Sequence, residues 1–129
     1  NEHMPDYVVR RVQALLNDHS KSVKGSKVLV FGLAYKADTS DARETPSRPI
    51  IAKLQTLGAQ VQLVDPHVGD AQFPEDVDRV DGTQTDLENA DLILYLVDHS
   101  NFDRDMIASA VAPVLDCRKA LKGDLVNYL

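Results

Sequence analysis

The chain has 129 residues, of which 43% are hydrophobic and 26% are charged, as in a globular domain with a single core. Its formal net charge of −6 argues against a nucleic-acid-binding surface, because phosphate neutralisation requires clustered Lys and Arg. No apolar run is long enough to cross a membrane, no signal peptide is evident, and the lone Cys117 cannot form an internal disulfide. These features predict a cytoplasmic protein.

The first expected element is an amphipathic helix. Pro5 suits a first helical turn. The apolar residues at helical spacing on one face are Val8, Val9, Val12, Leu15 and Leu16. The polar stretch 17–27, which contains Gly25, predicts a loop. We therefore expect residues 1–24 to form a helix and linker, and residues 25–129 to form the domain that they enter.

A buried strand and a second helix are expected next. The apolar run 28–32 ends in glycine and is typical of a parallel strand with both faces covered. The second helix is expected between Thr45-Pro46 and Gly58, and Pro49 is expected to delay its start by a few residues. Its apolar face is predicted to contain Ile50, Ile51, Leu54 and Leu57.

The rest of the chain alternates between strand and helix patterns. Val61–Val64 predicts a strand that Asp65-Pro66 stops. The polar segment 69–85 contains at most one short strand, around Val80. The other expected elements are a helical turn at 86–89, a strand at 92–97, a helix at 102–110 and a last strand at 114–115.

This alternation predicts a Rossmann-like, three-layer αβα sandwich with a mainly parallel sheet, preceded by the amphipathic helix. In open sheets of this class, ligands bind outside the carboxyl ends of the strands. The segments expected at that edge are 32–44, 65–68, 98–102 and 116–119.

The loop after the first strand fits a dinucleotide-binding turn poorly. The positions of a G-x-G-x-x-G fingerprint hold Gly32, Ala34 and Ala37, so only the first glycine is present. About a dozen residues separate Gly32 from the next helix, whereas a pyrophosphate-binding turn is tight. The loop instead contains Lys36 and Arg43, which can pair with a bound anion.

The segment 32–46, which reads GLAYKADTSDARETP, closely resembles the carboxy-terminal domain of UDP-glucose/GDP-mannose dehydrogenases. Gly58-Ala59 and Asp65-Pro66 extend a resemblance that covers nearly the whole chain. It implies an enzyme with an amino-terminal NAD domain, a helical dimerisation segment and this sugar-nucleotide domain. The family oxidises the C6 alcohol of a UDP-sugar to a carboxylate, with two NAD and a catalytic cysteine. The start at Asn1 suggests a fragment of such a homo-oligomeric enzyme.

The resemblance also assigns individual residues. Tyr35 and Lys36 match positions that contact the sugar nucleotide, and Arg118 matches an arginine that does so from the last strand. Arg43 matches a residue that reaches the NAD bound on the other domain. The family's catalytic cysteine lies upstream, so Cys117 is expected to be an inert thiol and no catalytic residue is expected here. Segment 98–102, Asp-His-Ser-Asn-Phe, looks most like dehydrogenases of UDP-N-acetylhexosamines, especially of UDP-N-acetylmannosamine.

Arg118, His99 and Asp65 also fit ordinary structural roles. Arg118 stays open between a ligand contact and a surface charge. His99 is expected to be a hydrogen-bonded loop histidine, and Asp65 is expected merely to end its strand. None of the four histidines has metal-ligand spacing to another histidine or to the cysteine, so no metal is expected.

Two other functions stay open. The first is a free-standing NAD-binding domain, which the missing glycines disfavour. The second is a non-catalytic regulatory domain of receiver-like α/β type. A receiver needs a phosphoacceptor aspartate beside an acidic pair, and Asp65 and Asp98 do not form that constellation convincingly.

Overall fold

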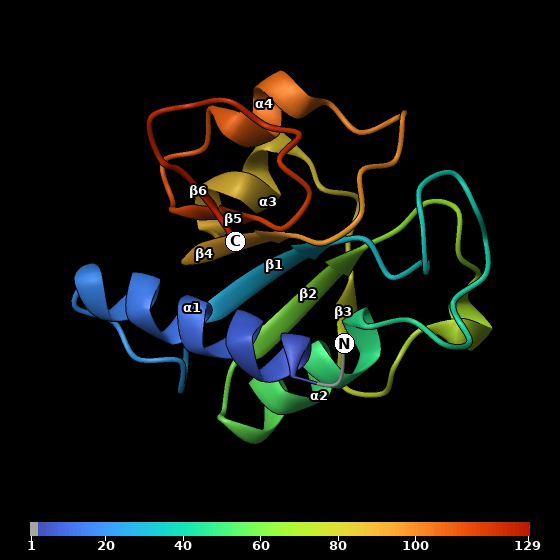
Figure 1. Cartoon of the computed structure of the whole chain (residues 1–129), viewed down its shortest axis with the longest axis horizontal. Helices are drawn as coiled ribbons and strands as arrows, with labels where there is room; N and C mark the ends of the chain where they lie inside the picture. Colours follow the sequence, from blue (N-terminus) through green and yellow to red (C-terminus); the bar gives the residue numbers. More distant parts are fainter. Residues whose placement is uncertain (1–2) are drawn as a thin grey trace.

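The computed structural model describes residues 3–129, so the start at Asn1 lies outside the described residues. A single parallel sheet has the strand order β3-β2-β1-β4-β5-β6 (Figure 1). Its strands are β1 (Lys27–Phe31), β2 (Gln60–Val64), β3 (Asp78–Arg79), β4 (Leu92–Tyr95), β5 (Val114–Asp116) and β6 (Val126–Tyr128). The helices are α1 (Met4–Asp18), α2 (Ser47–Thr56), α3 (Gln84–Asn89) and α4 (Arg104–Ala108), with a short 3₁₀ turn η1 (Asp70–Gln72). The predicted Rossmann-like fold is confirmed.

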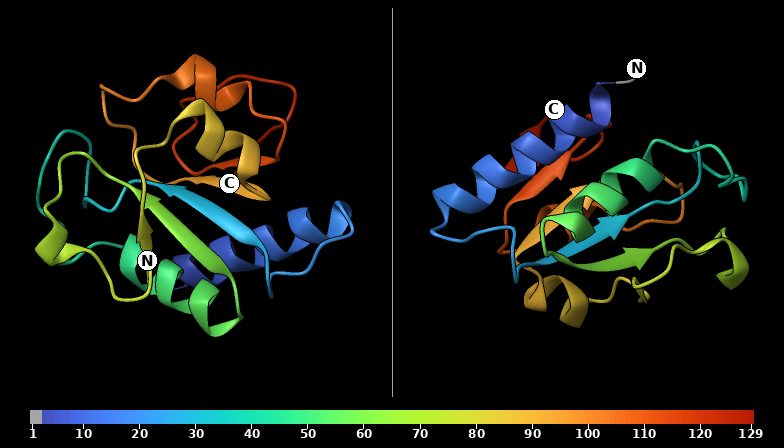
Figure 2. Two further views of the ribbon diagram at one scale, coloured as in Figure 1. Left: turned by 180° about the vertical axis from the view of Figure 1, so that it is seen from behind. Right: turned by 90° about the horizontal axis from the view of Figure 1, so that it is seen from below.

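Helices cover both faces of the sheet (Figure 2). The side chains of α1 and α2 belong to one buried cluster, in which Leu16 and Leu54 pack with Val30 of the central strand. The side chains of α3 and α4 belong to a second cluster, represented by Leu87 and Ile107. The two clusters lie on opposite faces of the sheet and make the molecule three layers deep.

Helix α1 is part of the core and not a detached leader. Val8, Val9, Val12 and Leu16 are buried, as the helical spacing predicts, while Leu15 is only half-buried. Asp6 of α1 forms an ion pair with Lys53 of α2, with Oδ1 and Nζ 2.8 Å apart. The predicted boundary between the helix and linker of residues 1–24 and the domain of residues 25–129 stays a prediction.

Helix α2 starts at Ser47, directly after Pro46, so Pro49 delays it little. Pro49 lies in the first turn, where a backbone N–H has no intrahelical acceptor, so its missing donor costs nothing. Gly58 follows the helix with a φ of +93°, as expected for a terminating glycine. Leu57 is exposed, so its place on the apolar face was predicted wrongly.

The carboxy-terminal third differs from the sequence prediction in detail. Strand β4 ends at Tyr95, because the N–H groups of Leu96 and Val97 both donate to the carbonyl of Phe31 and draw the chain out of the ladder. The expected helix at 102–110 is shorter, and a capping box at Thr83 starts α3 before residue 86. The prediction that the strand at 114–115 is the last is wrong, since β6 follows it at the sheet edge.

Candidate functional site

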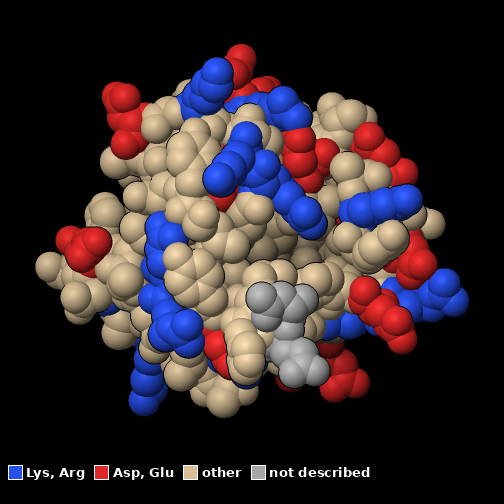
Figure 3. All heavy atoms as spheres, in the orientation of Figure 1, with Lys and Arg blue, Asp and Glu red and all other residues tan. Residues whose placement is uncertain are grey.

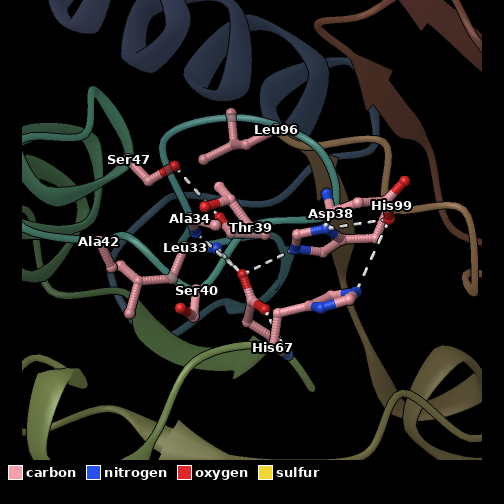
Figure 4. Close-up of polar contacts among 12 residues, drawn as sticks. Leu33, Ala34, Asp38, Thr39, Ser40, Ala42, Ser47, His67, Leu96 and His99 are labelled. Carbon is pink, nitrogen blue, oxygen red and sulfur yellow. Dashed lines mark hydrogen bonds and ion pairs between the residues drawn. The ribbon is translucent and has the colours of Figure 1, made fainter.

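Three of the four expected segments meet at the carboxyl edge of the sheet (Figure 4). The loop of residues 32–46 leaves β1, the turn 65–68 leaves β2 and segment 98–102 follows β4. The fourth, 116–119, follows β5 and is joined to β4 through Arg118, whose Nε donates to the carbonyl of Leu96 at 2.7 Å. We call the loop 32–46 the edge loop.

Gly32 sets the direction in which the edge loop leaves the sheet. Its φ is +107°, and a Cβ built at this position would lie 2.4 Å from Cβ of Val97. Only glycine fits such a backbone conformation beside so close a neighbour. Gly32 therefore allows the backbone at the end of β1 to pack closely against Val97.

Asp65 anchors the edge loop from below. It is only 2% exposed, and its Oδ2 accepts hydrogen bonds from the N–H groups of Leu33 at 2.8 Å and Ala34 at 2.9 Å. Nε2 of His99 lies 3.0 Å from the same oxygen, and the N–H of His67 donates to Oδ1 at 2.9 Å. Burial alone raises the pKa of Asp65, but these hydrogen bonds bring it below its ordinary value. The expectation that Asp65 merely ends its strand was wrong.

His99 is completely buried and ties two loops together. Its Nδ1 accepts the backbone N–H of Asp38 at 2.9 Å, so the ring proton must lie on Nε2, which donates to Asp65. The Asp38 carboxylate in turn accepts from the N–H and hydroxyl of Ser100, which lowers the pKa of Asp38. The predicted hydrogen-bonded loop histidine is confirmed, and its partners fix the edge loop.

Asp98 and Phe102 of segment 98–102 also face protein, whereas Asn101 is exposed. Asp98 accepts from the hydroxyl of Tyr95 at 2.6 Å and from Nε of Arg104 at 3.0 Å. The Phe102 ring stands edge-on to Phe31, with ring centroids 5.3 Å apart. Within this segment, only His99 and Ser100 contact the edge loop, both through Asp38.

The outer side of the edge loop displays the predicted ligand-contacting residues. Tyr35 is 48% exposed, and Nζ of Lys36 lies 5.7 Å from the centroid of its ring. The Arg43 side chain is 84% exposed and pairs with Asp41, whose Oδ2 lies 3.1 Å from NH2. Tyr35, Asp41, Arg43 and Glu44 line an open hollow of about 490 Å³. Three of the predicted residues thus share one exposed surface.

Arg118 lies in a different pocket, of about 210 Å³, between α1, the start of α2 and the carboxyl ends of β4 and β5. The fully buried Asp116 shapes the turn that carries it, because its carboxylate accepts the N–H groups of Arg118, Ala120 and Leu121 at 2.8 Å. The spacing Asp116-x-Arg118 is the sequence signal for this turn. The role of the Asp116 carboxylate as the acceptor that holds the turn was not predicted.

Cys117 lies beside Arg118 in this second pocket. Burial is the main cause that raises the pKa of the Cys117 thiol to about 12; Asp116 adds to the shift and Arg118 opposes it. We expect native chain to react with iodoacetamide at pH 8 at least tenfold more slowly than denatured chain, because burial keeps the Cys117 thiol protonated. Mass spectrometry of timed samples measures both rates. Fast labelling of native chain would show a reactive thiol.

Charge at the surface is mixed. On the face shown in Figure 3, basic side chains form a few groups, and acidic side chains lie between them and at the rim. Among residues 3–129, no helix is long and apolar enough to span a membrane. One group of side chains at the carboxyl edge can hold a metal ion: Asp38, His67 and His99.

A model of the UDP binding domain of the UDP-glucose/GDP-mannose dehydrogenase family matches residues 29–123. The chain belongs to this family. The match contains the edge loop, the turn after β2, segment 98–102 and Arg118.

Named relatives of the family agree with this match. The chain is 32% identical over 102 residues to a UDP-N-acetyl-D-mannosamine dehydrogenase of Methanococcus aeolicus, covering 79% of this chain and 22% of the relative. It is 33% identical over 125 residues to an NDP-N-acetyl-D-galactosaminuronic acid dehydrogenase of Ralstonia solanacearum, covering 92% and 27%. The chain spans about a quarter of the length of these curated relatives.

The fold is shared with a solved structure. The crystal structure of an NDP-N-acetyl-D-galactosaminuronic acid dehydrogenase from Methanosarcina mazei superimposes with a TM-score of 0.81 at 30% sequence identity. The alignment covers all of this chain and 29% of that one.

Proposed function

We propose that this chain is the carboxy-terminal, UDP-sugar-binding part of an NAD-dependent nucleotide-sugar 6-dehydrogenase, which oxidises the C6 alcohol of a UDP-sugar to a uronic acid. One observation carries the proposal. Within the region that matches the UDP binding domain, Asp65 and His99 brace the edge loop from beneath while Tyr35 and Lys36 are exposed on its outer side.

Each proposed contact has a chemical reason. The ammonium group of Lys36 and the guanidinium of Arg118 are suited to diphosphate oxygens, and Arg118 keeps its planar fork oriented through the bond to Leu96. The exposed Tyr35 ring offers an apolar face with a polar tip. Because Lys36 lies near the Tyr35 ring, the side chains of Tyr35 and Lys36 can contact one ligand.

Arg43 is proposed to contact NAD held mainly by the amino-terminal domain of the same enzyme. NAD, when bound, accepts the hydride from C6 of the sugar. The partner that Arg43 has now, Asp41, is no obstacle, because water screens this exposed ion pair and it is readily exchanged. The hollow beside Arg43 is open to solvent, as a site shared between two domains requires.

The catalytic nucleophile is proposed to lie outside this chain. The raised pKa of Cys117 keeps its thiol neutral near pH 7, which does not suit a nucleophile. The complete enzyme is proposed to be a homo-oligomer in the cytoplasm, where a cysteine without a disulfide partner is common. The alternative of a free-standing NAD-binding domain is disfavoured by the long loop after Gly32.

The proposed substrate is a UDP-N-acetylhexosamine, UDP-N-acetylmannosamine above all, because both curated relatives described above are named for N-acetylated sugars. In the complete enzyme that carries this chain, kcat/KM for that substrate should exceed kcat/KM for UDP-glucose at least tenfold. NADH absorbance measures both values. A preference for UDP-glucose or GDP-mannose would remove the sugar assignment.

The chain by itself should produce no NADH from NAD and UDP-sugars, because it has neither the glycine fingerprint nor a reactive thiol. The same assay with purified 129-residue chain serves as the test. NADH production above the buffer control would contradict the proposal that the catalytic thiol and the main NAD site lie outside this chain.

A further inference from the structure

Three side chains with metal-binding atoms converge beneath the edge loop, each from a different loop (Figure 4). Asp38 lies in the edge loop, His67 in the turn after β2 and His99 in the segment after β4. Oδ1 of Asp38 is 3.7 Å from Nε2 of His67 and 3.9 Å from Nδ1 of His99, and the three ligand atoms lie within 4.8 Å of one another.

Nε2 of the His67 ring has no hydrogen-bond partner, and the Asp38 carboxylate oxygen lies 3.7 Å from it. This nitrogen is inaccessible to solvent, although 31% of the side chain is exposed. Buried polar atoms are nearly always paired, so an unpaired one calls for an explanation. The ring lies against that of His99, with centroids 4.3 Å apart. The unpaired nitrogen therefore lies within the cluster, beside the other two ligand atoms.

Two of the three candidate ligands, His99 and Asp38, also form hydrogen bonds with neighbouring protein groups, as the ligands of metal sites commonly do. His99 donates from Nε2 to the buried Asp65 carboxylate, which fixes the tautomer and makes Nδ1 the acceptor, now occupied by the N–H of Asp38. Oδ1 of Asp38 is held by the N–H of Ser100 at 2.9 Å and its hydroxyl at 3.0 Å. Such hydrogen bonds orient ligating imidazoles and carboxylates and increase their affinity for a metal.

The two distances to Asp38 are close to those of a tetrahedral site, and the two imidazole nitrogens lie within 4.8 Å of each other. Zinc–ligand bonds of about 2.0–2.2 Å place neighbouring ligand atoms about 3.3–3.5 Å apart. Closing the cluster requires small shifts, and the N–H of Asp38 must release Nδ1 of His99. Asp38 lies in an exposed loop, so water can replace Nδ1 as the acceptor of this N–H.

We propose that Asp38, His67 and His99 bind a divalent transition-metal ion of the zinc type, with the fourth position left to water. Two imidazole nitrogens and one carboxylate oxygen favour such an ion over Mg²⁺ or Ca²⁺, which prefer oxygen ligands. The ion clamps the edge loop to the turns after β2 and β4. The sequence pattern did not reveal the site, because its three ligands come from loops that are distant along the chain.

Isothermal titration of ZnCl₂ into the 129-residue chain, freed of metal by a chelator and dialysed, tests the proposal. We expect about one equivalent to bind and the Tm to rise by several degrees, because an ion that binds only the folded state stabilises it. MgCl₂ should give neither effect. Absence of zinc binding above the buffer control would overturn the proposal.

His67→Ala is the decisive variant, because Nε2 of this ring makes no hydrogen bond and its removal should leave the fold intact. Its zinc Kd should rise at least tenfold, whereas His19→Ala, which changes an exposed histidine at the end of α1, should leave the Kd unchanged. Asp38→Asn keeps an oxygen for Ser100 but removes the charge, and it should also weaken binding at least tenfold. Equal zinc affinity in wild type and either site variant would contradict this assignment.

Discussion

Asp65→Asn is expected to lower the free energy of unfolding by about 2–4 kcal/mol, because a hydrogen bond to a charged acceptor is worth about 1.5–3 kcal/mol and a buried donor left unpaired costs about 1–3 kcal/mol. One carboxylate oxygen now accepts hydrogen bonds from Leu33, Ala34 and His99, and the other accepts the N–H of His67. An asparagine amide has one acceptor oxygen, so its NH₂ group must face at least one of these donors.

The other members of the network cannot compensate. If His99 moved its ring proton to Nδ1, that nitrogen would lose the N–H of Asp38 that it now accepts. The N–H groups of Leu33 and Ala34 are buried, so water does not replace a lost acceptor. In this variant the edge loop should open locally more often, in addition to the loss of global stability.

Urea denaturation at pH 7, followed by circular dichroism, measures the difference in unfolding free energy. Asp124→Asn, at an exposed turn, is the matched control and should change stability by less than about 0.5 kcal/mol. A loss below about 1 kcal/mol for Asp65→Asn would show that Asp65 does not anchor the loop.

The same network predicts the direction of the acid dependence. The pKa of Asp65 is lower in the folded chain than its ordinary value of 3.8, so its ionised form stabilises the fold above that pH. This contribution is lost as the pH falls below 3.8 through the folded-state pKa. The stability difference between wild type and Asp65→Asn should therefore narrow in strong acid.

In the complete enzyme, Lys36→Ala and Arg43→Ala are expected to weaken different ligands. Lys36 lies against the Tyr35 ring, whereas Arg43 lines the open hollow and is held only by an exposed pair with Asp41. Lys36→Ala should mainly weaken use of the UDP-sugar, and Arg43→Ala should mainly weaken use of NAD. Each loss should be about 1.5–3 kcal/mol, or ten- to a hundredfold in apparent affinity.

Two titrations on each variant separate these effects, with one ligand varied while the other saturates. Lys122→Ala removes an exposed cation in the loop between β5 and β6, outside the hollow beside Arg43, and it should change either affinity by less than about 0.5 kcal/mol. If both variants lose the same ligand, or neither loses any, the edge loop does not join the two ligands.

The sequence pattern predicted the layers of the fold because burial dominates them. The apolar runs of β1 and β4 are buried on both faces of the parallel sheet, and the spacing in α1 gives the helix one apolar face that covers the sheet. Strand β6 escaped prediction because its three residues lie at the sheet edge and none of them is fully buried. A short, half-exposed strand is fixed by its neighbour and leaves little pattern of its own.

The site was predictable only where a motif covers it. Tyr35, Lys36 and Arg43 follow from the run GLAYKADTSDARETP, and the structure leaves all three exposed on one loop. The buried partners Asp65 and Asp116 were missed because an aspartate after a strand has the same pattern whether it ends the strand or anchors a loop. Only the positions of the backbone N–H groups distinguish the two roles.

Titration of UDP into the isolated 129-residue chain tests most directly whether this domain binds the nucleotide part of the sugar nucleotide. We predict saturable binding of UDP, a ten- to a hundredfold weaker Kd in Lys36→Ala and no change in Lys122→Ala, since one charge-assisted contact is worth about 1.5–3 kcal/mol. NAD alone should give no saturable binding. Binding of NAD without binding of UDP, or equal UDP affinity in wild type and Lys36→Ala, would contradict the account.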